Sequence, residues 1–270
     1  MALKPFRTRI SNCNYCTTVH FCGSRTFLLY VNVVSAILNK MKQWKGMDFS
    51  MLTPAKKEFI EFMMSADVLR FGDFVTKSGR NTPYFVNTGN YKTGMQTSKL
   101  GEFYAAMVKE TVGEDFDAMF GPAYKGIPLA TSVAGALARN YGIDKPFFFN
   151  RKEAKDHGEG GNIVGYKPVD GDRIVIIEDV ITAGTAIRET LPVLYGAADV
   201  KVTDMFISVN RCEVGQTPGK TAVMEVGEEF GIHVHSLIDV RDIHEYLQGQ
   251  EKYADILPLM ESYMDKYCVF

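Results

Sequence analysis

The chain has 270 residues, of which 46% are hydrophobic and 23% charged, and its formal net charge at pH 7 is −2. This length and composition fit one or two globular domains and exclude a disordered chain, a collagen and a small disulfide scaffold. No apolar run reaches the roughly 18 residues that a membrane-spanning helix requires. A net charge near zero argues against nucleic acid as the main partner. We therefore expect neither a nucleic-acid nor a membrane partner.

The first 47 residues differ in composition from the rest. They carry seven basic residues and no acidic one, whereas the remainder has a net charge of −9. Cys13, Cys16, His20 and Cys22 could suggest zinc, but they lie within ten residues and no second pair of ligands follows. We expect residues 1–47 to be an N-terminal extension: a translated leader before a start at Met47, or a targeting peptide.

The cysteine content of the remaining chain indicates a cellular compartment. Only Cys212 and Cys268 lie beyond the extension, so no disulfide framework is expected. Such cysteine usage is typical of a reducing compartment. With Met47 as the start, we expect a cytoplasmic protein.

Residues 48–270 predict one domain of alternating strands and helices. Thr53 supplies a capping hydroxyl and Pro54 suits a first helical position. The expected elements, in chain order, are a helix from Thr53-Pro54, strands Phe71–Val75 and Pro83–Asn87, a helix Ser98–Val112, a strand Ala118–Phe120, a helix Ile127–Arg139, strands Phe147–Phe149 and Arg173–Ile177, a helix Thr185–Tyr195, strands Val202–Val209 and His233–Ile238, and a helical tail Ile243–Tyr267. This order predicts an α/β fold with a mainly parallel central sheet flanked by helices.

The most informative segment is Ile174-Val175-Ile176-Ile177-Glu178-Asp179-Val180-Ile181-Thr182-Ala183-Gly184-Thr185-Ala186. A buried strand ends in two adjacent carboxylates, and a loop of small and hydroxyl residues then opens a helix. Backbone N–H groups in such a loop form an anion site, and ligands bind at the carboxyl ends of parallel strands. The carboxylates suit ribose hydroxyls, a Mg²⁺ shell or a developing cation. The segment therefore predicts a sugar 5-phosphate lying across the loop.

These residues resemble the 5-phosphoribosyl 1-diphosphate (PRPP) binding motif of the type I phosphoribosyltransferases. The resemblance implies the fold of that family, with a hood subdomain from about residue 48 to 90 plus a C-terminal part, and a core at about 95–240. It implies that Glu178 and Asp179 contact the ribose hydroxyls. The remaining PRPP contacts that it implies in the loop are Val180, Ile181, Thr182, Ala183, Gly184, Thr185 and Ala186.

A second segment, from Asn150 to Gly161, packs cations and a histidine directly after a strand and ends in glycines. A charged run is usually a solvated surface. Here the glycines favour a lid over the substrate, and the cations match a diphosphate group. The segment looks like the catalytic loop of orotate phosphoribosyltransferases. Further matches to that family, at 71–74, 77–80, 83–87 and 121–128, extend the resemblance over roughly residues 53–265.

This second resemblance implies roles for individual residues. Lys77, Tyr124 and Lys125 would contact PRPP. The cations of the loop would reach across a homodimer interface into a shared active site; they are Arg151, Lys152, Lys155 and His157. Lys155 and His157 are candidates for charge neutralisation or proton donation at the diphosphate, beside Glu178 and Asp179 as the other catalytic residues. The residues implied for orotate are Tyr84, Phe85, Thr182 and Arg211, whose guanidinium suits a carboxylate.

The reaction implied is transfer of the phosphoribosyl group from PRPP to orotate, which gives orotidine 5-monophosphate and diphosphate in pyrimidine synthesis. Mg²⁺ would be the cofactor, held through PRPP and water rather than by direct protein ligands. A phosphoribosyltransferase for another base is an alternative, although it should lack the Arg151–His157 segment and the paired aromatic residues. A PRPP-sensing regulator is another, but residues 1–47 show no clear helix-turn-helix.

Overall fold

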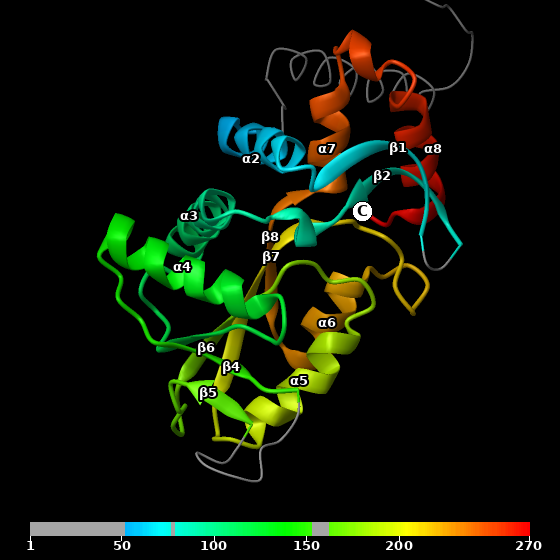
Figure 1. Ribbon diagram of the computed structural model, residues 1–270. Coiled ribbons are helices and arrows are strands. Elements are labelled where there is room, and N and C mark those ends of the chain that lie inside the picture. Colours follow the sequence, from blue (N-terminus) through cyan, green and yellow to red (C-terminus); the bar gives the residue numbers. More distant parts are fainter. Residues whose placement is uncertain (1–51, 77–78, 153–161) are drawn as a thin grey trace, which may run out of the picture. The chain divides into compact units, whose positions relative to one another are not determined.

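The computed structural model describes residues 52–76, 79–152 and 162–270 (Figure 1). The chain divides into two compact units, Met1–Phe49 and Ser50–Phe270, and every described residue belongs to the second unit. The predicted extension 1–47, with its candidate zinc ligands, lies outside the described residues. So do three predicted site residues, which are Lys77, Lys155 and His157.

Helices and strands alternate through most of this unit. In chain order they are α2 (Pro54–Ser65), β1 (Leu69–Val75), β2 (Asn81–Val86), the short 3-10 helix η1 (Thr88–Asn90), α3 (Gly94–Thr111), β3 (Ala118–Phe120), α4 (Gly126–Tyr141), β4 (Phe147–Asn150), β5 (Ile163–Gly165), β6 (Arg173–Ile177), α5 (Thr185–Tyr195), β7 (Lys201–Asn210), α6 (Ala222–Phe230), β8 (His233–Asp239), α7 (Val240–Leu247), η2 (Glu251–Tyr253) and α8 (Leu257–Tyr267).

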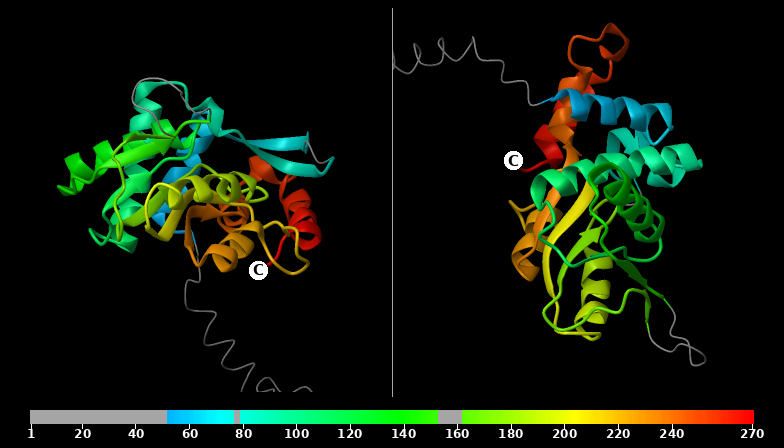
Figure 2. Two further views of the ribbon diagram at one scale, coloured as in Figure 1. Left: turned by 90° about the horizontal axis from the view of Figure 1, so that it is seen from below. Right: turned by 90° about the vertical axis from the view of Figure 1, so that its left-hand side faces the viewer.

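The centre of the unit is a six-stranded sheet in the order β5-β4-β3-β6-β7-β8. All its neighbouring strands run parallel except β4 and β5, which are antiparallel. Alternate residues of β6 face opposite sides: Val175 and Ile177 join one apolar core, Ile174 and Ile176 the other. Helices α3 and α4 cover the first face and α5 and α6 the second (Figure 2). The predicted α/β fold with a mainly parallel sheet is confirmed.

A second, two-stranded sheet pairs β1 with β2 antiparallel. Elements from both ends of the described unit pack together around it: β2 lies against α8, and α2 lies against α7 (Figure 1). Lys56 of α2 forms a 2.9 Å ion pair with the fully buried Asp242 of α7. The predicted bounds of the hood and core subdomains stay predictions.

Most predicted elements are present, and some bounds agree to the residue, as for Ala118–Phe120, Arg173–Ile177 and Thr185–Tyr195. The predicted tail helix Ile243–Tyr267 is wrong as one element. It breaks after α7 because Gly249 adopts a left-handed φ of 72°, which a continuous helix does not allow. Strand β5 and helix α6 were not predicted. The signal for α6 was Thr221, whose hydroxyl caps the helix by accepting from the backbone N–H of Met224.

Candidate active site

The acidic pair lies where β6 ends, in the middle of the large sheet. Hydrogen bonds to β7 continue past the end of β6. The N–H of Glu178 donates to the carbonyl of Phe206. The backbone N–H and the side-chain hydroxyl of Ser208 both donate to the carbonyl of Asp179. From α3, the hydroxyl of Tyr104 donates to the carbonyl of Glu178 at 2.8 Å. The backbone beneath the two carboxylates is therefore fixed from two elements.

Three donors hold the carboxylate of Asp179. Its Oδ2 accepts from Nζ of Lys125 at 2.8 Å and from the hydroxyl of Thr88 at 2.5 Å, and its Oδ1 accepts from the N–H of Val180 at 2.7 Å. Burial alone would raise the pKa of Asp179, but the bonds from Lys125 and Thr88 outweigh it and leave the pKa below its ordinary value. Asp179 is thus an ionised carboxylate at neutral pH.

Glu178 is in the opposite electrostatic state. Its Oε1 accepts from the N–H of Asp179 at 2.9 Å. Burial first, and then the charge of Asp179, raise the pKa of Glu178 to about 8. Two adjacent carboxyl groups therefore differ in charge near neutral pH, and Glu178 can donate a hydrogen bond where Asp179 can only accept.

The predicted phosphate loop follows the pair and leads into α5. Gly184 caps the helix with a left-handed φ of 71°, and a Cβ there would lie 2.8 Å from Cγ2 of Val226 on α6. The site therefore requires glycine. A pocket of about 280 Å³ runs along this loop. The exposed residues lining it are Thr182, Ala183, Thr185 and Ala186, whereas Val180 is half-buried and Ile181 is buried beneath them. Free N–H groups at a helix start suit an anion.

Predicted diphosphate contacts lie on the loops after β3 and β4. Tyr124 is 70% exposed, and Nζ of Lys152 lies 5.7 Å from the centre of its ring. The two loops are joined by a 2.9 Å hydrogen bond from the N–H of Ala123 to the side chain of Asn150. Nη1 of Arg151 is buried and has no hydrogen-bond partner among the described residues. These cations flank the segment 153–161, which lies outside the described residues.

Arg211 lies just past β7 in a partly buried polar cluster. Its guanidinium bonds Oε1 of Glu213 through two nitrogens, at 2.6 and 2.7 Å, and Nη2 lies 3.0 Å from the hydroxyl of Tyr263. Burial alone would lower the pKa of Arg211, but Tyr84, Glu213 and Tyr263 outweigh it and raise the pKa. The guanidinium of Arg211 is therefore already paired in the structure.

The two aromatic residues predicted for orotate point in different directions, because successive side chains of a strand face opposite sides. Tyr84 is completely buried, with its ring 4.9 Å from the guanidinium carbon of Arg211. Phe85 is half-buried and lies against Phe74, 5.6 Å between ring centres. The structure brings Tyr84 to Arg211 but does not bring Phe85 to the same surface. Contact of either residue with orotate stays a prediction.

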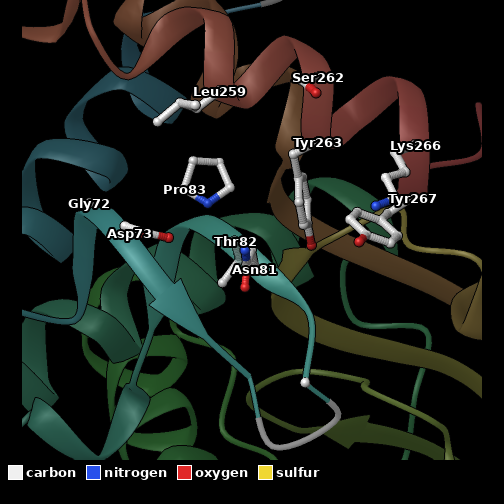
Figure 3. Close-up of a pocket in the computed structure, with 11 residues that line it drawn as sticks. Gly72, Asp73, Asn81, Thr82, Pro83, Leu259, Ser262, Tyr263, Lys266 and Tyr267 are labelled. Carbon is white, nitrogen blue, oxygen red and sulfur yellow. The ribbon is translucent and has the colours of Figure 1, made fainter.

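A larger pocket, of about 560 Å³, lies between the β1–β2 hairpin and α8 (Figure 3). Thr82 and Pro83 of β2 form one wall, and Tyr263 and Tyr267 of α8 form the other. The ring of Tyr263 lines this pocket, while its hydroxyl contacts Glu213 and Arg211. Tyr263 thus connects the hairpin pocket with the Arg211 cluster.

Several residues of the site were not predicted. Thr88 and Ser208 contact Asp179, Tyr104 contacts Glu178, and Glu213 and Tyr263 contact Arg211. The sequence offered only one indication of these residues, which is their position in the chain. Thr88 follows a predicted strand, and Glu213 lies two residues after Arg211. Within the described part of the chain, no helix is both long and apolar enough to span a bilayer.

Comparison with known proteins identifies the family. Residues 87–214 match the phosphoribosyl transferase domain. An orotate phosphoribosyltransferase of Clostridium beijerinckii is 52% identical over 202 residues, which are 75% of this chain and 90% of the relative. One from Actinobacillus pleuropneumoniae is 48% identical over 214 residues, 79% of this chain and 98% of the relative.

The solved structures agree with the sequence relatives. The crystal structure of orotate phosphoribosyltransferase from Francisella tularensis superposes with a TM-score of 0.70 at 35% identity, covering 78% of this chain and 99% of that one. These relatives show that this chain belongs to the orotate phosphoribosyltransferases, the enzymes that transfer a phosphoribosyl group from PRPP to orotate in pyrimidine synthesis.

Proposed function

We propose that the carboxyl end of β6 is the PRPP site of this enzyme. The observation that carries the proposal is the juxtaposition of an ionised Asp179, its cation Lys125 and the exposed loop that opens α5. Asp179 and Glu178 bind the ribose hydroxyls, one as an acceptor and one as a donor at neutral pH. The loop from Thr182 to Ala186 binds the 5-phosphate through backbone N–H groups and hydroxyls.

The diphosphate then lies toward the loops after β3 and β4. Lys125 and Lys152 supply positive charge there, and Lys152 lies beside the exposed ring of Tyr124. Arg151 supports this placement, because its buried nitrogen lacks a partner among the described residues and an anion would satisfy it. Lys77, Lys155 and His157 complete the set in the proposal, on the family resemblance alone.

Orotate is assigned to the region of Arg211. A planar guanidinium matches a carboxylate in a two-point contact. Because Glu213 holds Arg211 in the structure, orotate would compete with Glu213 for the guanidinium or bind its free edge. Thr182 and the aromatic residues of β2 are the remaining proposed contacts.

Mg²⁺ is the proposed cofactor. The described residues contain no group of three His, Cys, Asp or Glu side chains able to hold a metal by themselves. Mg²⁺ in proteins usually keeps several waters and binds substrate phosphates, and in this proposal Glu178 and Asp179 would be the residues that reach it through water. When bound with PRPP, Mg²⁺ would neutralise charge on the diphosphate.

The proposed mechanism uses positioning and electrostatics. Departure of the diphosphate builds positive charge on the ribose ring, as in glycoside chemistry. Asp179 places negative potential near that charge, while Lys125 and Lys152 stabilise the leaving group. Arg211 aligns the orotate nitrogen with the ribose C1. Lys155 or His157 supplies further positive charge, or a proton, to the diphosphate.

We further propose a cytoplasmic homodimer with shared active sites. Arg151 and Lys152 lead into the 153–161 segment, and in this proposal the segment reaches the active site of the partner subunit. Mixing an inactive Lys155→Ala subunit with an inactive Asp179→Asn subunit tests the sharing. Complementation should restore part of the activity, whereas no recovery in the mixed dimer would contradict shared sites.

The reaction itself is tested by following orotate consumption through its ultraviolet absorbance. Orotate should disappear only when both PRPP and Mg²⁺ are present, and uracil or hypoxanthine should not replace it. Consumption of another base would favour a different base specificity. PRPP binding without consumption of any base would favour the PRPP-sensing alternative, and gel shifts with nucleic acid would then follow.

A further inference from the structure

The hydroxyl of Thr88 lies between the two charged groups at the centre of the site. Its Oγ1 is 2.5 Å from Oδ2 of Asp179 and 3.1 Å from Nζ of Lys125. The ammonium and the carboxylate also contact each other at 2.8 Å. Three groups from three segments therefore form a closed triangle of hydrogen bonds.

The chemistry of the partners fixes the direction of each bond. An ammonium can only donate and an ionised carboxylate can only accept. The hydroxyl of Thr88 must therefore accept from Lys125 and donate to Asp179. The hydroxyl of Thr88 does both at once. Serine retains the group, while valine has the same shape and neither capability.

The backbone of Thr88 is held in place on both sides. The preceding Asn87 donates its N–H to the carbonyl of Val68 at 2.8 Å. Asn90 donates its side-chain amide to the carbonyl of Asp67 at 2.7 Å. Both bonds attach η1 to the chain just before the start of the small sheet, so the hydroxyl is presented at a fixed position rather than from a free loop.

We propose that Thr88 is a positioning residue for PRPP, which orients the Asp179 carboxylate toward the ribose and holds Lys125 beside it. This inference rests on the proposed function, which assigns both charged groups to PRPP. Thr88 itself touches neither substrate in the proposal. It acts on the two groups that do, and it couples the end of β2 to the centre of the large sheet.

Steady-state kinetics of Thr88→Val, Thr88→Ser and a control variant test the proposal. The control is Thr131→Val, because Thr131 is exposed and its hydroxyl bonds only the carbonyl of Ile127 within α4. Thr88→Val removes both charge-assisted hydrogen bonds of the hydroxyl. Even one such bond predicts a fall of about 10- to 100-fold in kcat/KM for PRPP. The KM for orotate should stay within about twofold, because this bond lies at the PRPP site. Serine should restore at least about half of the activity, and the control should match the wild type.

A second measurement separates positioning from folding. PRPP affinity of the intact protein is measured by calorimetry on Thr88→Val, Asp179→Asn and the double variant. If Thr88 acts through Asp179, valine should weaken binding about tenfold or more alone, but by a clearly smaller factor in the Asp179→Asn background, where only the contact with Lys125 is left for valine to remove. Additive effects would overturn the proposal. So would a valine variant equal to wild type, or a serine variant as impaired as valine.

The outcomes also separate this inference from the proposed function. If Asp179→Asn impairs PRPP binding while Thr88→Val does not, only the role of Thr88 fails. If Asp179→Asn binds and uses PRPP normally, the assignment of the acidic pair fails, and the positioning role fails with it.

Discussion

The ammonium nitrogen of Lys125 lies 2.8 Å from Oδ2 of Asp179, which pairs the residue that precedes α4 with a residue that follows β6. Asp179 is buried, whereas the Lys125 side chain is more than half exposed. Because the lysine faces solvent, incoming diphosphate can share it, while the buried carboxylate keeps a partner in the free enzyme. The pair thus connects the proposed ribose and diphosphate subsites.

Removing the positive charge of Lys125 should weaken PRPP use more than orotate use. For Lys125→Met we expect kcat/KM for PRPP to fall by about 10- to 100-fold, since a hydrogen bond to a charged group contributes about 1.5–3 kcal/mol. Steady-state kinetics with each substrate varied measures this. Lys109→Met, at the exposed end of α3, is the matched control and should retain wild-type constants. Equal effects of the two variants would contradict the assignment.

The raised pKa of Glu178 predicts how stability depends on pH. The folded protein keeps a proton on Glu178 up to a pKa of about 8, whereas the unfolded chain loses it near the ordinary value of 4.5. The free energy of unfolding should therefore fall as pH rises from about 4.5 to about 8. In Glu178→Gln the free energy of unfolding should fall less over this range, and its excess over the wild-type value should be largest above pH 8. Urea unfolding across this range measures it.

The control for the Glu178 prediction is Glu110→Gln, an exposed carboxyl near the end of α3. It should follow the wild-type pH dependence throughout. A Glu178→Gln variant whose free energy of unfolding declines with pH as steeply as the wild type would show that Glu178 is ionised in the folded protein at neutral pH.

Gly184→Ala should lower the free energy of unfolding by more than the strain of a left-handed alanine alone explains. Gly142 offers a matched comparison, because its φ of 69° is nearly the same but nothing lies within 4 Å of an added Cβ. Gly142→Ala should cost about 1–2 kcal/mol for the left-handed conformation alone. Gly184→Ala adds a 2.8 Å contact with Val226, which predicts about 1–3 kcal/mol more and a raised KM for PRPP. Thermal unfolding and kinetics of both variants test this, and equal losses would rule out the contact as the cause.

Arg211→Lys should affect orotate more than PRPP. Lysine keeps the charge but loses the planar fork that matches a carboxylate, so we expect the KM for orotate to rise about tenfold or more. The KM for PRPP should change by less than about twofold. Arg139→Lys, on α4, is the control, and it should leave the KM for orotate and the KM for PRPP unchanged. A selective rise in the KM for PRPP would move Arg211 out of the orotate site.

Tyr84→Phe should leave the fold intact. The hydroxyl of Tyr84 is buried without a hydrogen-bond partner among the described residues, so its removal should keep or raise the free energy of unfolding, by up to about 1 kcal/mol. Tyr84→Leu also removes the ring beside Arg211 and should cost about 2–4 kcal/mol. Chemical denaturation measures both. A large loss in Tyr84→Phe would reveal a partner for the hydroxyl.

The local pattern of the sequence was sufficient for the five parallel strands of the large sheet, though not for the antiparallel β5, and for the acidic loop. Arg173–Ile177 is apolar after its first residue because both faces of a central parallel strand are buried. The polar residues Glu178 and Asp179 follow directly, at the carboxyl end of that strand, where ligands bind in parallel sheets. This signal is contiguous in the chain, and one short segment therefore predicted both the strand and the proposed phosphate site.

The partners of those residues depend on packing between distant segments. Thr88 and Lys125 meet Asp179 across 91 and 54 residues of sequence, and no local pattern indicates such contacts. The same holds for Tyr263, which reaches Arg211 across 52 residues. Tyr84 and Phe85 face opposite sides because the side chains of β2 alternate, and contact of either residue with orotate stays a prediction.

The sequence by itself determined the α/β class, the order of most elements, the acidic pair and the family. Those features follow from periodicity and from motifs in which neighbouring residues act together. Only the tertiary structure decided that the pKa of Glu178 is raised while that of Asp179 is lowered, that Thr88 joins the site, and that Glu213 holds Arg211. The lowered pKa of Asp179 and the place of Thr88 depend on groups that distant segments bring within about 3 Å, the range where hydrogen bonds act. The raised pKa of Glu178 depends first on burial.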